Sequence, residues 1–241
     1  AINGPYIKIQ DAVDALPTTL TGHSCVVIKD GANYVEQVTV RNFTNNGSSI
    51  TIFADPASGF RPTVSPPALS TAAFHIVNAS VNIQGIYIQG NQSIPYGIVT
   101  SSAYVNISSV VITTSGSLGI YTAGVRISSW STISNSSVTV WNAHAFWLDG
   151  STRTTVSYST AVNNSASRYP VFIDGGKNNA FAVIFASNSH ASGYALYILG
   201  SDTNTVTQSY LWGSNEGADF AIGSDYNTIS FSTMIGNRAG I

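Results

Sequence analysis

Charge is scarce in this chain of 241 residues, which contains nine Lys and Arg and eleven Asp and Glu. Only 8% of the residues are charged, whereas an ordinary globular domain has about 25%. Because nucleic-acid binding depends on clustered Lys and Arg, this composition excludes general binding of nucleic acid. No apolar run approaches ~18 residues, so no membrane span is predicted. Disorder is excluded as well, because 44% of the residues are hydrophobic and 11% are aromatic.

Cysteine is limited to Cys25, which excludes an internal disulfide framework. The chain opens without a basic region followed by an apolar stretch, so it displays no signal peptide. The histidines have none of the spacings typical of metal ligands, and we therefore predict neither a metal site nor a cofactor. These histidines are His23, His75, His144 and His190.

Uncharged polar residues take the place of charge, since Ser, Thr and Asn fill about a third of the chain. Together with many β-branched residues, this composition predicts β-structure with frequent turns. From residue 74 onward a unit recurs, with a short apolar triplet, a polar turn, a second apolar anchor and a third short strand. The triplets are His75-Ile76-Val77, Gly97-Ile98-Val99, Val125-Arg126-Ile127, Phe146-Trp147-Leu148, Val171-Phe172-Ile173, Leu196-Tyr197-Ile198 and Phe220-Ala221-Ile222. The second anchors are Ile83, Ile107, Ile133, Val156, Phe181, Val206 and Ile229.

Both series repeat about every 24 residues, which predicts an all-β fold, a right-handed single-stranded parallel β-helix. A propeller would need a period of about 40–45 residues, and the consensus of leucine-rich repeats is missing. We expect nine or ten coils, with the last residues of the seven triplets forming one buried column. Asn179, Asn204 and Asn227 recur at one turn position, where a left-handed backbone is tolerated, and should form a ladder of side-chain amides.

The N-terminal region should close the first coil. Ile9, Ala12, Val13 and Leu16 have helical spacing, so residues 9–16 are predicted to form a capping helix that ends before Pro17. The first strands are expected at residues 26–28, 38–40 and 50–53, and residues 55–69 as an irregular proline-containing loop. We therefore predict a single domain over residues 1–241, with the cap and irregular first coils in 1–73 and regular coils in 74–241.

Two parts of the chain resemble a known superfamily. Residues 200–206 (Gly-Ser-Asp-Thr-Asn-Thr-Val) and 223–229 (Gly-Ser-Asp-Tyr-Asn-Thr-Ile) are similar to the generic repeat of right-handed parallel β-helices of the pectin-lyase-like superfamily. Residues 6–17 and 27–40 resemble the opening of its pectinesterases. The resemblance implies this fold and a role connected with polysaccharides. However, the pectinesterase segments Gln-Asp-Thr-Leu and Asp-Phe-Ile-Phe-Gly and the polygalacturonase Gly-His-Gly are absent, so no catalytic residue carries over.

Two carboxylates nevertheless stand one coil apart, Asp149 and Asp174, each followed by glycine. Such a pair could share a proton, bind calcium, or serve as acid and nucleophile. Alternatively, each Asp-Gly simply starts a turn, with the carboxylate capping a backbone amide. For a lyase, Arg126, Arg168 and Lys177 are the available basic residues.

An aromatic stripe is the second candidate site. The middle residue of each triplet should point outward, which places Trp147, Phe172 and Tyr197 in consecutive coils between Arg126 and Ala221. His144, Tyr169 and Tyr194 form the neighbouring column, with Arg153, Arg168 and Lys177 nearby as charges for an acidic glycan. Exposed stacked aromatics bind a sugar or a protein surface, unless a loop of the chain itself covers them.

Two functions follow from these patterns. The first is an exported or cell-surface β-helix that acts as a non-catalytic scaffold, adhesin or glycan-binding module. The alternative is a carbohydrate-active enzyme, such as a lyase, glycoside hydrolase or pectinesterase-like protein. The segment from Met234 to Ile241 contains nothing that would cap the last coil. We therefore expect either a part of a longer β-helical protein or self-association through this C-terminal coil.

Overall fold

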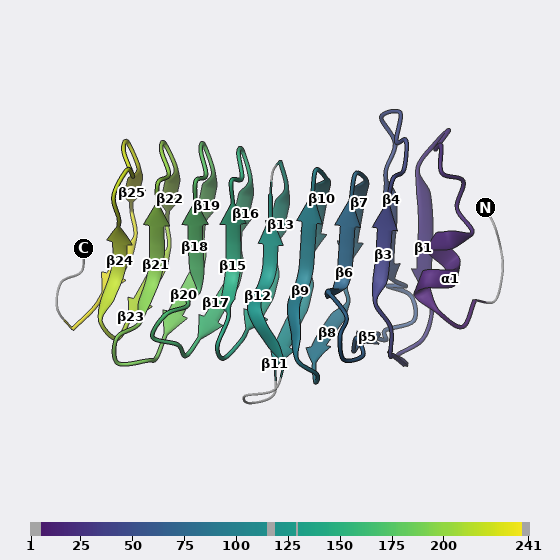
Figure 1. Ribbon diagram of the computed structural model, residues 1–241, viewed down its shortest axis with the longest axis horizontal. Coiled ribbons are helices and arrows are strands. Elements are labelled where there is room, and N and C mark those ends of the chain that lie inside the picture. The colour runs from purple at the N-terminus through teal and green to yellow at the C-terminus, as the bar shows by residue number, and fades with distance from the viewer. Residues whose placement is uncertain (1–5, 115–118, 129, 238–241) are drawn as a thin grey trace.

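The backbone winds into a right-handed parallel β-solenoid of about eight turns with ~25 residues in each. The structure is a computed structural model and describes residues 6–114, 119–128 and 130–237. Each turn contributes one strand to each of three parallel sheets, and successive turns lie side by side along the long axis (Figure 1). The predicted fold class is therefore confirmed. Two sheets contain nine strands and the third contains eight, at the lower end of the expected nine or ten coils.

Nine strands form the first sheet: β1 (Ser24–Ile28), β4 (Ile50–Ala54), β7 (Ser80–Gln84), β10 (Tyr104–Ser108), β13 (Thr132–Ser134), β16 (Thr155–Ser157), β19 (Ala180–Ala182), β22 (Thr205–Thr207) and β25 (Thr228–Ser230). The second sheet also has nine: β2 (Asn33–Tyr34), β5 (Thr63–Val64), β8 (Tyr87–Gly90), β11 (Val111–Thr114), β14 (Ser137–Thr139), β17 (Thr160–Asn163), β20 (Phe185–Asn188), β23 (Tyr210–Gly213) and β26 (Thr233–Ile235). The third sheet has eight: β3 (Val38–Arg41), β6 (Ala72–Val77), β9 (Ile94–Ser101), β12 (Ile120–Ile127), β15 (His144–Asp149), β18 (Val171–Asp174), β21 (Tyr194–Leu199) and β24 (Glu216–Phe220).

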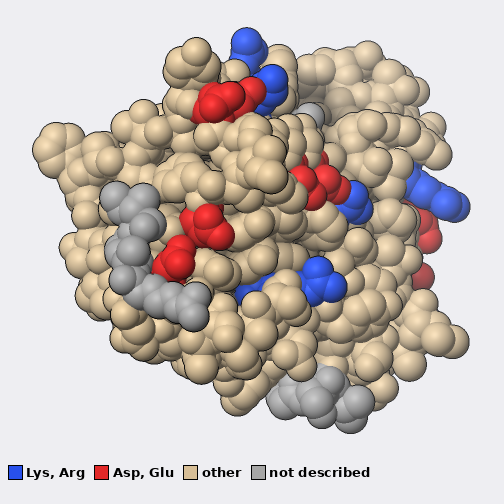
Figure 2. Space-filling model, turned by 60° about the vertical axis from the view of Figure 1, so that its left-hand side comes forward, with Lys and Arg blue, Asp and Glu red and all other residues tan. Residues whose placement is uncertain are grey.

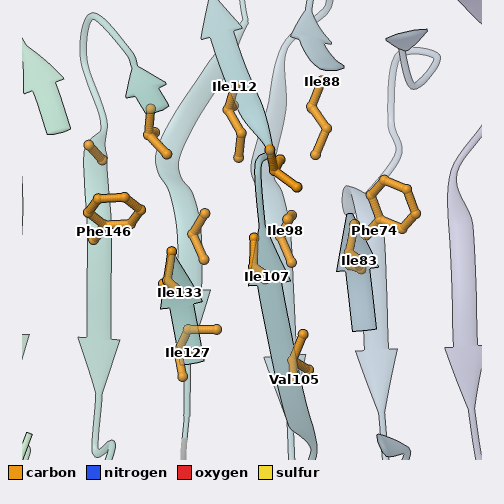
Figure 3. Close-up of a cluster of buried hydrophobic side chains, with 14 of the residues drawn as sticks. Phe74, Ile83, Ile88, Ile98, Val105, Ile107, Ile112, Ile127, Ile133 and Phe146 are labelled. Carbon is orange, nitrogen blue, oxygen red and sulfur yellow. The ribbon is translucent and has the colours of Figure 1, made fainter. Parts of the chain in front are cut away.

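The interior is filled by columns of apolar side chains, because alternate residues of each strand point inward. Figure 3 shows Ile83, Ile107 and Ile133 of the first sheet facing Phe74, Ile98 and Phe146 of the third. The seven second anchors pair from coil to coil without a shift, as the repeat predicted. Each buried side chain of this size contributes about 1.5–3 kcal/mol relative to exposure, so the stacked columns are the main source of stability.

The predicted buried column of the third sheet is only partly correct. Ile127, Leu148, Ile173 and Ile198 do lie in one buried column. Val77 and Val99 belong to other columns, because the inward positions of β6 and β9 are Ile76 and Thr100. Ile222 lies beyond β24 and is 94% exposed, and Phe220 takes its place beside Ile198. The coils differ in length at these points, so a fixed period assigns the triplet wrongly.

A short helix, α1 (Ile9–Asp14), closes the first coil, close to the predicted 9–16. Ile9 and Val13 are buried against the core. The carboxylate of Glu36 accepts hydrogen bonds from the backbone N–H groups of Ile9 and Gln10 at 2.9 and 3.0 Å. Because the first N–H groups of a helix have no partner within it, this carboxylate stabilises the start of the helix. No described helix is long and apolar enough to cross a membrane.

The expected amide ladder is present. The Asn179 side chain donates to Asn204 Oδ1, and the Asn204 side chain donates to Asn227 Oδ1, both at 3.0 Å. The left-handed backbone lies one residue earlier than expected, at Asn178, Thr203 and Tyr226. The predicted loop at 55–69 contains a strand, β5, which pairs with β2 and β8. The expectation about an uncapped C-terminal coil concerns residues up to 241, of which 238–241 lie outside the described residues.

Candidate functional site

The outer face of the third sheet carries the predicted aromatic stripe. Arg126, Trp147, Phe172 and Tyr197 pair in register through four successive strands. The next residue of this column is Asp219, and not Ala221 as the triplets suggested. Phe172 is 9% exposed, while Trp147 and Tyr197 on either side are half-buried. The stripe thus presents two accessible aromatic rings separated by a nearly covered one.

Three more rings complete an aromatic cluster, which we define as His144, Trp147, Tyr169, Phe172, Tyr194 and Tyr197. Tyr169, from the loop before β18, stacks on Tyr197 of the following coil with ring centroids 4.4 Å apart and planes within 12°. His144 stacks on Phe172 at 4.6 Å. Such pairs each contribute about 0.5–1.5 kcal/mol beyond burial. The cluster is therefore a fixed surface, built mainly by the rings covering one another.

His144 is the buried member of the cluster, at 2% exposure, whereas the stripe interpretation had placed it on the surface. Its Nδ1 accepts the backbone N–H of Tyr169 at 3.1 Å. Its Nε2 lies 3.3 Å from Nη1 of Arg168. A donor therefore faces each ring nitrogen, and the neutral imidazole can accept from one of them at a time. Burial, assisted by the Arg168 charge, lowers the pKa of His144 to about 3. The imidazole is thus a neutral packing surface at ordinary pH.

The two stacked carboxylates lie at one edge of the aromatic cluster. Asp149 pairs with Asp174 in the strand register, as the 25-residue spacing predicted. Arg126 donates from Nε to Asp149 at 2.8 Å and also forms an ion pair with it. Burial and the neighbouring Asp149 raise the pKa of Asp174. The two carboxylates therefore differ in environment, since Arg126 forms an ion pair with Asp149, whereas Asp174 has no ion-pair partner among the described residues.

The remaining basic candidates do not converge on the stripe. Lys177 Nζ lies 3.1 Å from Asp202, in the turn after β18. The guanidinium of Arg153 stacks over Trp130 at 5.3 Å. Arg168 is the basic residue that contacts the cluster, through His144. The described residues contain no group of three or more His, Cys, Asp or Glu that could hold a metal ion.

The sequence patterns missed three residues of this face. Tyr96 lies under the Arg126 guanidinium, 5.7 Å from it, and Glu216 and Asp219 pair with Tyr194 and Tyr197. Asp219 could have been found if the last triplet had been aligned two residues earlier. The position of Tyr96 depends on a register shift between β9 and β12, which a fixed period does not show.

No protein-family model matches this chain, and no curated protein does either. Its fold is nevertheless similar to solved structures. The pectin methylesterase from Aspergillus niger matches with a TM-score of 0.64 and 14% identity, over 99% of this chain and 90% of the esterase. A tailspike protein of an Escherichia coli O157:H7 bacteriophage matches with a TM-score of 0.51 and 15% identity. That match covers 95% of this chain and 36% of the tailspike. A protein of Geobacillus virus E2 also has a TM-score of 0.51, at 12% identity, over 95% of this chain and 58% of the viral protein.

At these identities the likeness concerns the fold. The chain therefore shares its right-handed parallel β-helix architecture with these solved structures, as its repeats had suggested. Its site has to be interpreted from its own residues.

Proposed function

We propose that this protein is a non-catalytic, glycan-binding β-helix. It would act as a scaffold or adhesin module that binds a polysaccharide outside the cell or at its surface. The observation that carries this proposal is the aromatic cluster on the outer face of the third sheet. Sugar rings present apolar C–H faces that pack on aromatic rings, and their hydroxyl groups bond to nearby polar side chains. The similarity in fold to a pectin methylesterase and a tailspike protein is compatible with such a role.

The dimensions of the cluster suit an extended chain of sugars. Trp147 and Tyr197 are two coils apart, which corresponds to about 10 Å along the solenoid axis. Two sugar rings in a row could therefore each contact one accessible aromatic ring. Because Trp147 packs against His144 and Phe172, and Tyr197 packs against Tyr169, little conformational entropy is lost on binding.

The test compares two double variants. Trp147→Ala with Tyr197→Ala should weaken binding to a soluble polysaccharide at least about ten-fold in titration calorimetry, since both half-buried rings of the stripe are removed. The matched control is Phe185→Ala with Tyr210→Ala, a pair that stacks at 5.4 Å on the second sheet. The control pair should bind like the original chain. The control variant should melt within a few degrees of the original chain. The Trp147 and Tyr197 variant should melt at a lower temperature but still fold cooperatively, because five ring contacts of the cluster are lost.

Two results would contradict the proposal. Binding that survives the loss of Trp147 and Tyr197 would mean that the cluster is only structural. If both double variants lost affinity equally, the polysaccharide would bind to any exposed aromatic ring and not to a specific site. Far-ultraviolet circular dichroism identifies a variant that has lost its fold. In that case Trp147→Leu with Tyr197→Leu replaces it, because leucine keeps more of the packing without an aromatic ring.

The second candidate function is a carbohydrate-active enzyme, favoured by the different environments of Asp149 and Asp174. A carboxyl group with a raised pKa beside an ionised one is the arrangement of an acid and its partner in glycoside hydrolysis. Under this hypothesis Asp174 would protonate the leaving-group oxygen while a water molecule attacks the anomeric carbon. Asp149, held by Arg126, would accept the proton released by that water. The double variant Asp149→Asn with Asp174→Asn should then abolish reducing-end release. Turnover that persists in this variant would remove both carboxylates from the mechanism.

A further inference from the structure

We infer that the polysaccharide bound by the aromatic cluster is uncharged, and that acidic glycans are disfavoured at this face. This inference rests on the proposed function and specifies its ligand class. It also replaces the expectation that nearby arginines and a lysine serve an acidic glycan. Two basic residues near the aromatic cluster already form ion pairs with aspartates, and these pairs determine which charges a ligand would meet.

The basic residues near the cluster are largely occupied. The Arg126 guanidinium is paired with Asp149 and stacks on Trp147, 5.0 Å from the ring centroid. Lys177 is paired with Asp202. Among the described residues, only Arg168 contacts the cluster without an ion-pair partner. An anionic sugar therefore finds a single uncompensated cation at the cluster.

Carboxylates without an ion pair outnumber that cation. Within the described part of the chain, Asp174, Glu216 and Asp219 have no salt-bridge partner. Glu216 and Asp219 pair in register with Tyr194 and Tyr197 of the cluster. Asp174 lies two residues after Phe172 in β18, and it pairs with Leu199 of the next coil. The charge of Asp219 is close enough to contribute to the raised pKa values of Tyr169 and Tyr197.

These carboxylates act differently on the two classes of glycan. An acidic polysaccharide repeats a carboxylate along its length, so a segment on Trp147 and Tyr197 would bring like charges within about one Debye length of Asp174 and Asp219. A neutral polysaccharide has only hydroxyl groups there, and these donate hydrogen bonds to carboxylates. Figure 2 shows charged side chains as isolated groups on an otherwise uncharged surface, with acidic and basic groups often adjacent.

The experiment uses hexasaccharides that differ only in charge. The pairs are β-1,4-glucan and its C6-oxidised form, β-1,4-mannan and mannuronate, and methyl-esterified and free galacturonan. The full chain is titrated with each by calorimetry at about 20 mM and 500 mM salt. In every pair that binds, the neutral member should bind at least about ten-fold more tightly at low salt. The ratio should shrink at high salt because screening shortens the range of repulsion.

A charge variant assigns the cause. Asp174→Asn, Glu216→Gln and Asp219→Asn together should raise affinity for the acidic member about ten-fold or more, while the neutral member changes much less. Tighter binding of the acidic members to the original chain would overturn the inference and leave the proposed function intact. If none of the six oligosaccharides binds, the proposed function fails, and the inference fails with it. A charge preference that persists in the triple variant would also overturn it.

Discussion

Acid should destabilise this protein through one buried imidazole. The pKa of His144 is lowered to about 3 in the folded chain, whereas an exposed histidine has a pKa of about 6.5. Between these values the unfolded chain takes up a proton that the folded chain refuses. The contribution of His144 to stability is therefore complete above pH ~6.5 and is lost as the pH falls toward 3.

The size of the effect follows from the two pKa values. Relative to neutral pH, the free energy of unfolding should fall by about 1.4 kcal/mol at pH 5.5 and by about 2.7 kcal/mol at pH 4.5. This is a large part of the 5–15 kcal/mol that stabilises a typical domain. The physical origin is that His144 is enclosed by Trp147, Tyr169 and Phe172, with the Arg168 guanidinium at its Nε2.

The assay is urea unfolding of the original chain and of His144→Asn between pH 7.5 and 4.5. Asparagine keeps an acceptor for the Tyr169 N–H but does not titrate. Other groups, such as Asp174 and His75 with their own shifted pKa values, titrate equally in both proteins. The difference in unfolding free energy between the two proteins should therefore change by about 2.7 kcal/mol over this range. A difference that is independent of pH would refute the assignment of a neutral, desolvated His144.

Two further predictions concern the turns. Asn204→Ala should cost about 3 kcal/mol in urea unfolding, because it leaves the backbone N–H and side-chain amide of buried Asn179 without their acceptor. Exposed Asn91→Ala is its control and should change stability by under ~0.5 kcal/mol, and equal effects would contradict the ladder's role. Val183 is 38% exposed and has a φ of 55°, a conformation that costs a β-branched residue about 1–2 kcal/mol. Val183→Asn should therefore raise the melting temperature, and a lower value would show that the Val183 side chain contributes more by packing than it costs in backbone strain.

The sequence was most informative where the coils have equal length. The amide ladder and the Asp149–Asp174 pair were predicted because these coils repeat every 23 to 25 residues without an insertion. The period failed at both ends of the third sheet. β9 has eight residues and a register shift, and the short connection before β24 moves Asp219 into the aromatic column. Contacts between distant segments, such as Glu36 on α1, have no periodic signal at all.

The candidate site was predictable to a similar degree. Alternation of side chains identified the outward column of Trp147, Phe172 and Tyr197. It could not show that His144 is buried, because that depends on the loop before β18, which places Tyr169 and Arg168 over the imidazole. The alternation also could not show which Lys and Arg side chains lack an ion-pair partner, because ion pairing depends on side-chain geometry between coils. The charge preference that we propose for the site therefore rests on the three-dimensional arrangement and not on the sequence pattern.

The position of charge around the coil gives a separate reason to place function on the third sheet. Beyond Arg61, the charged residues of the described chain lie in strands of the third sheet, in the loop before β18 or in the turns that join the third sheet to the first. Those in the turns are Arg153, Lys177, Asp202 and Asp225. The corresponding strands of the first and second sheets carry Ser, Thr, Asn and apolar residues instead. Solubility alone would not confine charge to one side of a solenoid, because any outward position could accept it. Under the proposed function a binding face would account for it, since charged groups would fix the orientation of a ligand held by the aromatic rings. The third sheet is thus the face on which variants should be made first.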